Sequence, residues 1–162
     1  MTHITEVLVV GDGPVAEALV PMLGTLGWSA RAATTLPEVE QALPSCGAVV
    51  VLSHHDEVDA PAIAAAVRAG TAYVGAMGSR RTQARRREWL LADGVGEETL
   101  AALHAPIGLD IGADEPGEIA VSILAELVAV HRGRTTEVTS IAERDGAIHP
   151  DLAPGEATCP GG

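Results

Sequence analysis

The sequence predicts a doubly wound α/β fold, with a parallel sheet and helices on both faces. Short β-branched runs alternate with longer segments of helical periodicity along most of the 162 residues. Hydrophobic residues make up 47% of the chain, yet there is no Phe and only one Tyr, so the core must be aliphatic. Aliphatic cores suit a buried parallel sheet under Ala-rich helices. The length fits one domain with a sizeable core.

The first predicted strand, residues 6–10, runs into a glycine turn. Gly11, Gly13 and Ala16 have the spacing G-x-G-x-x-A of dinucleotide-binding turns. In that motif the first glycine allows a tight turn, and the second lets a pyrophosphate approach the backbone. Pro14 fits the first helical turn, because its missing N–H costs little there. This stretch therefore predicts a phosphate-binding loop.

The second strand is expected at 28–33, followed by a helix that a capping box at Thr35 and Glu38 opens. In NAD-binding folds an acidic residue at the end of this strand holds the ribose hydroxyls. Here the strand ends in Ala and Thr, with no acid. That absence counts against an NAD site.

The third strand, 48–52, is a continuous apolar run that ends before His54 and His55. Ligands bind at strand ends in open α/β sheets, so His54 is a candidate site residue. The alternative is a pair of solvated loop histidines. Two neighbouring histidines without a third ligand make a poor metal site, and no metal is expected. Asp59 is expected to cap the following helix, with Pro61 in its first turn.

The fourth strand, 71–77, leads through Gly78 and Ser79 into a helix expected from Ser79 to about residue 92. Five of the ten positive charges lie in this helix, beginning with Arg80 and Arg81. A helix start offers unpaired N–H groups and a positive dipole end, so arginines there suggest an anion site. The alternative is a solvated arginine face on a surface helix.

Because the strands are expected in the order 3-2-1-4-5, the switch point should lie between strands one and four. The Gly11 turn and the turn at 78–81 would then face each other across one crevice, with His54 on the same edge. This convergence favours a ligand site over a solvated face.

Beyond that helix we expect a short helix to about residue 104, an extended segment over 105–112, and an amphipathic helix from 118 to 131. The globular domain should end near residue 133. Residues 134–162 are rich in Thr, Pro and Gly, which predicts a mobile tail with Cys159 as an exposed thiol.

Charge and composition exclude several classes of function. The formal net charge of −12 argues against binding nucleic acid or an acidic membrane surface. No apolar run approaches the length of a membrane span, and the N-terminus has no secretory signal. Cys46 and Cys159 do not form a disulfide framework, and Cys46 is expected to be a packing residue. A cytoplasmic protein is therefore expected.

Three stretches, at 73–82, 104–113 and 118–128, resemble the Rossmann domain of the XdhC/CoxI family, and the resemblance extends over about 7–133. It implies a Rossmann-like fold and an accessory role in maturing a molybdenum hydroxylase such as xanthine or carbon monoxide dehydrogenase. The implied ligand is molybdenum cofactor, a pterin, or a dinucleotide such as NAD(P). No catalytic residue is assigned, and a cofactor-binding chaperone is expected rather than a catalyst. The candidate cofactor-binding residues are Gly11, Gly13, Pro14, Val15, His54, Gly78, Ser79, Arg80, Arg81, Gly108 and Asp110.

The chain departs from the family pattern in places. Pro14 stands where the family usually has His, and His55 where Asp is common. The family's usual N-terminal domain has no counterpart here, so the expectation is either that a separate chain supplies it or that the activity has drifted from that of the family. The expected partners are a molybdenum hydroxylase apoenzyme and a second copy in a homodimer. The alternatives are an NAD(P)-dependent oxidoreductase and a non-catalytic nucleotide-sensing or scaffold subunit.

Overall fold

A computed structural model describes residues 2–134 and 138–143. Most of the expected tail, including Cys159, lies outside these residues. The strands are β1 (Glu6–Val10), β2 (Ser29–Ala33), β3 (Ala48–Val51) and β4 (Tyr73–Ala76). The helices are α1 (Pro14–Thr25), α2 (Leu36–Ala42), α3 (Asp56–Arg68), α4 (Arg80–Ala92), α5 (Glu97–Ala101) and α6 (Pro116–His131). Two short 3₁₀ turns are η1 (Leu43–Ser45) and η2 (Ile141–Glu143).

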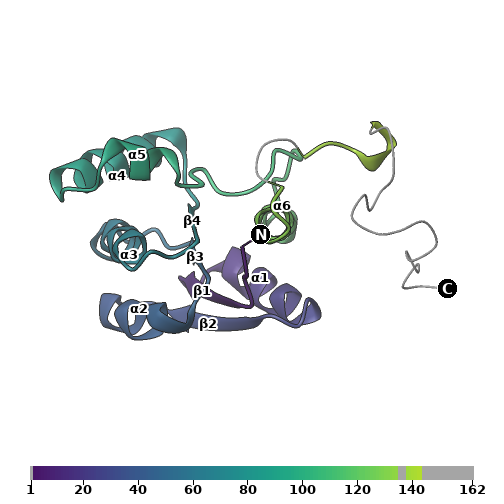
Figure 1. Cartoon of the computed structure of the whole chain (residues 1–162), viewed down its shortest axis with the longest axis horizontal. Helices are drawn as coiled ribbons and strands as arrows, with labels where there is room; N and C mark the ends of the chain where they lie inside the picture. The colour runs from purple at the N-terminus through teal and green to yellow at the C-terminus, as the bar shows by residue number, and fades with distance from the viewer. Residues whose placement is uncertain (1, 135–137, 144–162) are drawn as a thin grey trace.

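The predicted fold class is confirmed: the strands form one parallel sheet between two helical layers. Helices α1 and α6 cover one face, and α2, α3 and α4 lie on the other side (Figure 1). Alternate residues of β1 point towards opposite helical layers, because successive side chains of a strand lie on opposite faces of the sheet. Val7 and Val9 pack with the α1–α6 layer, whereas Leu8 and Val10 pack with the opposite layer. Both faces of the sheet are therefore buried.

The predicted strand order 3-2-1-4-5 is wrong, because the observed order is β2-β1-β3-β4. The switch point lies between β1 and β3, so β3 separates the Gly11 turn from the Gly78 turn. The amino-acid composition of β2 and β3 explains why the observed strand order differs from the predicted one. All four residues of β3 are buried, whereas β2 carries Ser29 and Arg31 and is mostly exposed, as an edge strand should be. The order 3-2-1 would have placed this polar strand between two others.

The segment after α5 extends the sheet only briefly. His104 forms a parallel bridge with Gly75, and the Ile107 N–H donates to the Ala76 carbonyl over 3.0 Å. Beyond this point the chain moves onto α6, where the Leu109 N–H donates to the Ser122 carbonyl. The expected extended segment is thus a short edge addition beside β4.

Helix α3 begins three residues before the expected cap. Its N-cap is His55, so Asp59 lies in the first turn and Pro61 inside the helix. Asp59 is fully buried rather than exposed at a cap, because it is paired with Arg86 of α4. The other helix boundaries agree with the expected ones to within a few residues. In the part of the chain that the structure covers, no helix combines the length and apolarity needed to cross a bilayer.

Candidate functional site

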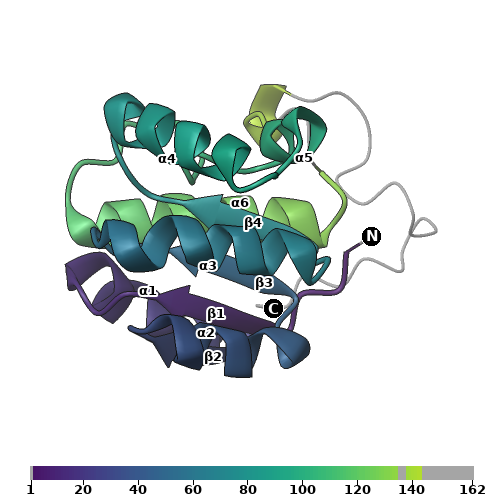
Figure 2. The same ribbon diagram turned by 90° about the vertical axis from the view of Figure 1, so that its left-hand side faces the viewer.

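The loops that follow β1, β3 and β4 leave the sheet at the same edge, because parallel strands end together. Figure 2 shows this edge beside the starts of α1, α3 and α4. It brings together the candidate residues of the first three loops, which are Gly11, Gly13, Pro14, Val15, His54, Gly78, Ser79, Arg80 and Arg81. The Gly11 turn adjoins the end of β3, and the Gly78 turn lies one strand further across the sheet.

Gly11 makes the closest backbone approach at this edge. Its φ is +123°, a conformation that favours glycine. A Cβ added there would lie 2.9 Å from the backbone nitrogen of Ser53 at the end of β3. The Gly11 N–H donates to the Ala33 carbonyl, which ties the turn to β2 as well. Gly11 therefore lets the turn pass tightly between two strand ends.

Gly13 differs from Gly11, because it faces open space. It is the N-cap of α1 with φ −78°, and a Cβ added to it would meet nothing within 4 Å. No side chain caps this helix, and Pro14 occupies its first position. The N–H groups of Val15 and Ala16, in the first turn, have no partner within the helix. The start of α1 thus combines free donors, the positive end of a dipole, and room for a ligand.

The starts of three other helices at this edge are less suited to bind an anion. In α4 the Ser79 hydroxyl accepts the Thr82 N–H over 3.2 Å. Helix α6 has a capping box formed by Glu115 and Glu118. Helix α3 has no side-chain cap, but its first turn contains three acidic residues, which disfavour an anion. Among these helix starts, α1 is therefore the best suited to bind a phosphate.

The arginines of α4 divide into two groups. Three of them pair with carboxylates: Arg85 with Asp56, Arg86 with Asp59, and Arg87 with Glu97. Within residues 2–134 and 138–143, neither Arg80 nor Arg81 forms an ion pair. Both lie in the first turn of α4, which has no acidic residue and where the helix dipole disfavours positive charge. Two uncompensated cations at this edge of an acidic protein favour an anionic ligand.

Arg86 has a structural role that the sequence analysis missed. Its side chain is 3% exposed and donates to the Met77 carbonyl (2.6 Å) and the Ser53 carbonyl (3.4 Å). It also pairs with Asp59 over 2.7 Å, and the Ser53 hydroxyl donates to the same carboxylate. Arg86 thereby ties the end of β3 to the end of β4. The available signal was its position four residues before Leu90, which places it on the buried face of α4.

The two histidines after β3 have different positions. His54 is exposed at the site edge. His55 occupies the N-cap position of α3, and its backbone N–H donates to the Ser53 hydroxyl over 3.3 Å. Across the described ranges, no group of three or more His, Cys, Asp or Glu side chains is placed to hold a metal ion. Cys46 is buried, and this burial raises the pKa of its thiol, as expected for a packing residue.

The end of β2 does have a carboxylate nearby, that of Glu38 in the expected capping box. Glu38 accepts the N–H groups of Thr34 (2.7 Å) and Thr35 (3.0 Å). These backbone hydrogen bonds hold the pKa of Glu38 below its ordinary value. The carboxylate is committed to capping α2, so it is not arranged like the ribose-binding acid of an NAD site.

Two candidate residues, Gly108 and Asp110, belong to a different region, beside α6. The Gly108 N–H donates to Glu126 over 3.1 Å, and Asp110 lines a cavity with His104 and Glu126. Glu126 also accepts from the Tyr73 hydroxyl (2.5 Å) and lies 3.3 Å from His104. Burial raises the pKa of Glu126, but these hydrogen bonds outweigh it and hold that pKa below its ordinary value. Gly108 and Asp110 therefore lie against the middle and end of α6 rather than beside the glycine turn.

Comparison with known proteins identifies the family. The model of the XdhC Rossmann domain matches residues 7–127. The molybdenum cofactor insertion chaperone PaoD of Escherichia coli (strain K12) is 28% identical over 126 residues, which are 77% of this chain and 40% of PaoD. A probable xanthine dehydrogenase subunit of Bacillus subtilis (strain 168) is 35% identical over 85 residues, 52% of this chain and 24% of that protein. The uncharacterized protein YqeB of Escherichia coli (strain K12) is 48% identical over 59 residues, 36% of this chain and 11% of that protein.

The chain therefore spans less than half the length of these relatives. A solved chain described as a xanthine dehydrogenase from Bacillus halodurans has the same fold, with a TM-score of 0.64 and 23% identity. That similarity covers 81% of this chain and 45% of the solved one. With the family match over residues 7–127, these similarities establish that the chain belongs to the XdhC family and carries its Rossmann domain.

Proposed function

We propose that this protein is an accessory factor in the maturation of a molybdenum hydroxylase. In this role it binds molybdenum cofactor or a related nucleotide at the edge formed by Gly11–Val15 and the start of α4. Family membership and the similarity to the insertion chaperone PaoD support the role. The similarity to a probable xanthine dehydrogenase subunit supports the class of client enzyme.

One observation carries the choice of site: α1 begins without a side-chain cap, beside open space at Gly13, on the edge that holds Arg80 and Arg81, two arginines that form no ion pair with any described residue. These features fit the phosphate of a pterin cofactor or of a nucleotide. The N–H groups of Val15 and Ala16 would donate to the phosphate oxygens. Arg80 and Arg81 would supply the opposing charge. The cofactor is cargo in this proposal, and the residues of the chain hold and orient it.

The test is equilibrium binding of molybdenum cofactor, AMP, NAD and NADP to the purified protein and to Gly13→Val. A branched side chain at Gly13 would fill the open space and should weaken binding of the preferred ligand by about tenfold or more. Gly96→Val is the matched control, because Gly96 is also an N-cap with φ −73° and open space around its Cβ position.

Unchanged affinity in folded Gly13→Val would make the glycine turn merely structural and refute the site. Saturable binding of NAD or NADP without molybdenum cofactor binding would favour the oxidoreductase alternative instead. Binding of AMP alone would favour a nucleotide-sensing or scaffold subunit.

We further propose that the protein contacts the hydroxylase apoenzyme directly and forms a homodimer. The contact with the apoenzyme follows from a role in cofactor insertion, because a cofactor can be transferred only between two proteins whose surfaces adjoin.

A further inference from the structure

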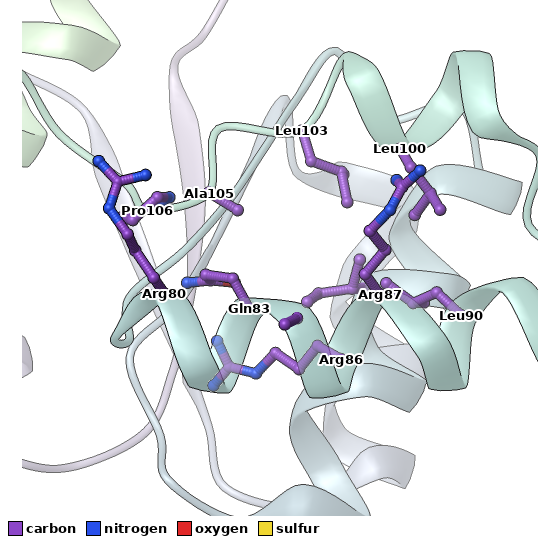
Figure 3. A pocket seen from close by; sticks show the side chains of 11 residues that line it. Arg80, Gln83, Arg86, Arg87, Leu90, Leu100, Leu103, Ala105 and Pro106 are labelled. Atoms are coloured by element: carbon purple, nitrogen blue, oxygen red, sulfur yellow. The ribbon is translucent and has the colours of Figure 1, made fainter.

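A cavity of about 330 Å³ lies between α4 and the segment that follows α5 (Figure 3). Buried aliphatic side chains form its floor, and Arg80 and Arg87 lie at opposite ends of it (Figure 3). The apolar lining residues are Ile63, Ala84, Leu90, Leu100, Leu103, Ala105 and Pro106. Small-molecule sites typically measure about 300–1,000 Å³, so this cavity has room for one ring system rather than a whole dinucleotide.

One wall of the cavity offers a fixed hydrogen-bond acceptor. The side-chain nitrogen of Gln83 donates to the carbonyls of Ala76 (3.0 Å) and Gly78 (3.4 Å). These two bonds hold the amide in place and leave its oxygen, Oε1, as the group that a ligand can use. An N–H on the edge of a heteroaromatic ring is a suitable donor to it.

The two arginines at the ends of the cavity are not equivalent. Arg87 is paired with Glu97, whereas Arg80 forms no ion pair within the part of the chain that the structure describes. Arg80 is exposed and lies beside Pro106 at the end nearest the start of α4 (Figure 3). A planar guanidinium there can bind a carboxylate or phosphate through two parallel N–H bonds.

We propose that this cavity binds a flat heteroaromatic ring that has an edge N–H and an acidic group. The ring lies on the aliphatic floor, its N–H donates to Gln83, and its acidic group pairs with Arg80. This inference goes beyond the proposed function, because a phosphate at the start of α1 does not require the cavity. Arg80 is the residue that the two sites share.

The probe is pterin-6-carboxylate, which has a flat ring, ring N–H groups, a carboxylate and its own fluorescence. Binding is followed by fluorescence titration of the full chain. Arg80→Gln should weaken binding on the order of tenfold, as expected for the loss of a charge-assisted contact. Arg81→Gln should change it by no more than about twofold, because Arg81, which likewise forms no ion pair among the described residues, does not line the cavity.

Ala84 provides a second test that does not involve charge. It is exposed on α4 and lines the cavity, so Ala84→Trp should fill the space and abolish binding without disturbing the core. Ala84→Ser is its control and should bind as the wild type does. Pterin without the carboxylate should bind at least about tenfold more weakly to the wild type than pterin-6-carboxylate.

Absence of saturable binding to the wild type, or equal affinity in Ala84→Trp and Ala84→Ser, would overturn the inference. The outcome is separable from that of the proposed function. Cofactor binding that is sensitive to Gly13→Val, together with no saturable binding of pterin-6-carboxylate, would leave the phosphate site in place and remove only the cavity.

Discussion

Among single residues, Arg86 and Asp59 hold the proposed site edge together, because their pairing joins the ends of β3 and β4. Both side chains are almost fully buried. Breaking a buried pair by removing one partner leaves an uncompensated charge and costs about 3–5 kcal/mol. We therefore expect Arg86→Met to lower the free energy of unfolding by about that amount, measured by urea denaturation followed by circular dichroism.

The same two helices provide a matched control. Asp56 and Arg85 form an ion pair over 2.8 Å, but both side chains are more than half exposed. Exposed pairs contribute about 0–1 kcal/mol, so Arg85→Met should have little effect. The double variant Asp59→Leu with Arg86→Met should be more stable than Arg86→Met alone, since no buried charge remains. Similar losses in Arg86→Met and Arg85→Met would show that the buried pair does not hold the edge.

At the scale of elements, His131 at the end of α6 contacts the N-terminal segment of the chain. The Ile4 N–H donates to Nδ1 of His131 over 3.1 Å, and the His131 ring lies against those of Trp28 and His3. Only neutral imidazole can accept this bond. Burial, followed by the electrostatic effects of Arg132 and His3, holds the pKa of His131 below its ordinary value.

This lowered pKa predicts a dependence of stability on pH. The unfolded chain, where His131 has a pKa of about 6.5, binds the proton more readily than the folded chain. The contribution of His131 is therefore complete above about pH 6.5 and is lost as the pH falls through that value towards the folded pKa. His131→Gln retains an acceptor for the Ile4 N–H but does not titrate.

The measurement is the unfolding free energy of both proteins by urea denaturation, between about pH 8 and pH 5. The wild type should lose stability relative to His131→Gln as the pH falls below about 6.5. Carboxylates titrate in both proteins, so their effect cancels in the difference. A constant difference over this range would contradict the prediction.

Element types were predictable from sequence, because apolar runs and caps act locally. The capping box at Thr35 and Glu38 is present as expected, and Ser79 caps α4. Strand order was not predicted correctly, because the right-handed crossover rule permits more than one order of parallel strands. The polar composition of β2 marked it as an edge strand, and that signal would have excluded the order 3-2-1.

At the scale of the whole molecule, the sequence predicted which loops share one edge of the sheet, but not the ion pairs that form along that edge. Motifs at strand ends identify the edge, because every parallel strand ends there. Which arginines are neutralised depends on carboxylates far away in sequence, such as Asp59 and Glu97. The cavity beside α4 depends on how the segment after α5 packs, and no local pattern encodes that.

The predicted homodimer must form despite a formal net charge of −12 on each copy. Two such copies repel each other, so the interface should be the face with the fewest charges. The layer of α1 and α6 meets this condition, because Glu17, Glu118 and Glu126 are the only acidic residues of these helices and Glu126 is largely buried. Val20 and Val121 are 37% and 47% exposed on this layer.

We therefore expect sedimentation equilibrium at high micromolar concentration to give a dimer, and Val121→Glu to give a monomer. A charge at the centre of an apolar contact is desolvated without a partner, which strongly opposes association. Trp89→Glu is the control, because Trp89 is 41% exposed on α4, on the opposite side of the sheet. A monomeric wild type would refute the dimer. A dimer that tolerates Val121→Glu but not Trp89→Glu would place the interface on α4, where Arg80 and Arg81 of each copy would have to be kept apart or neutralised.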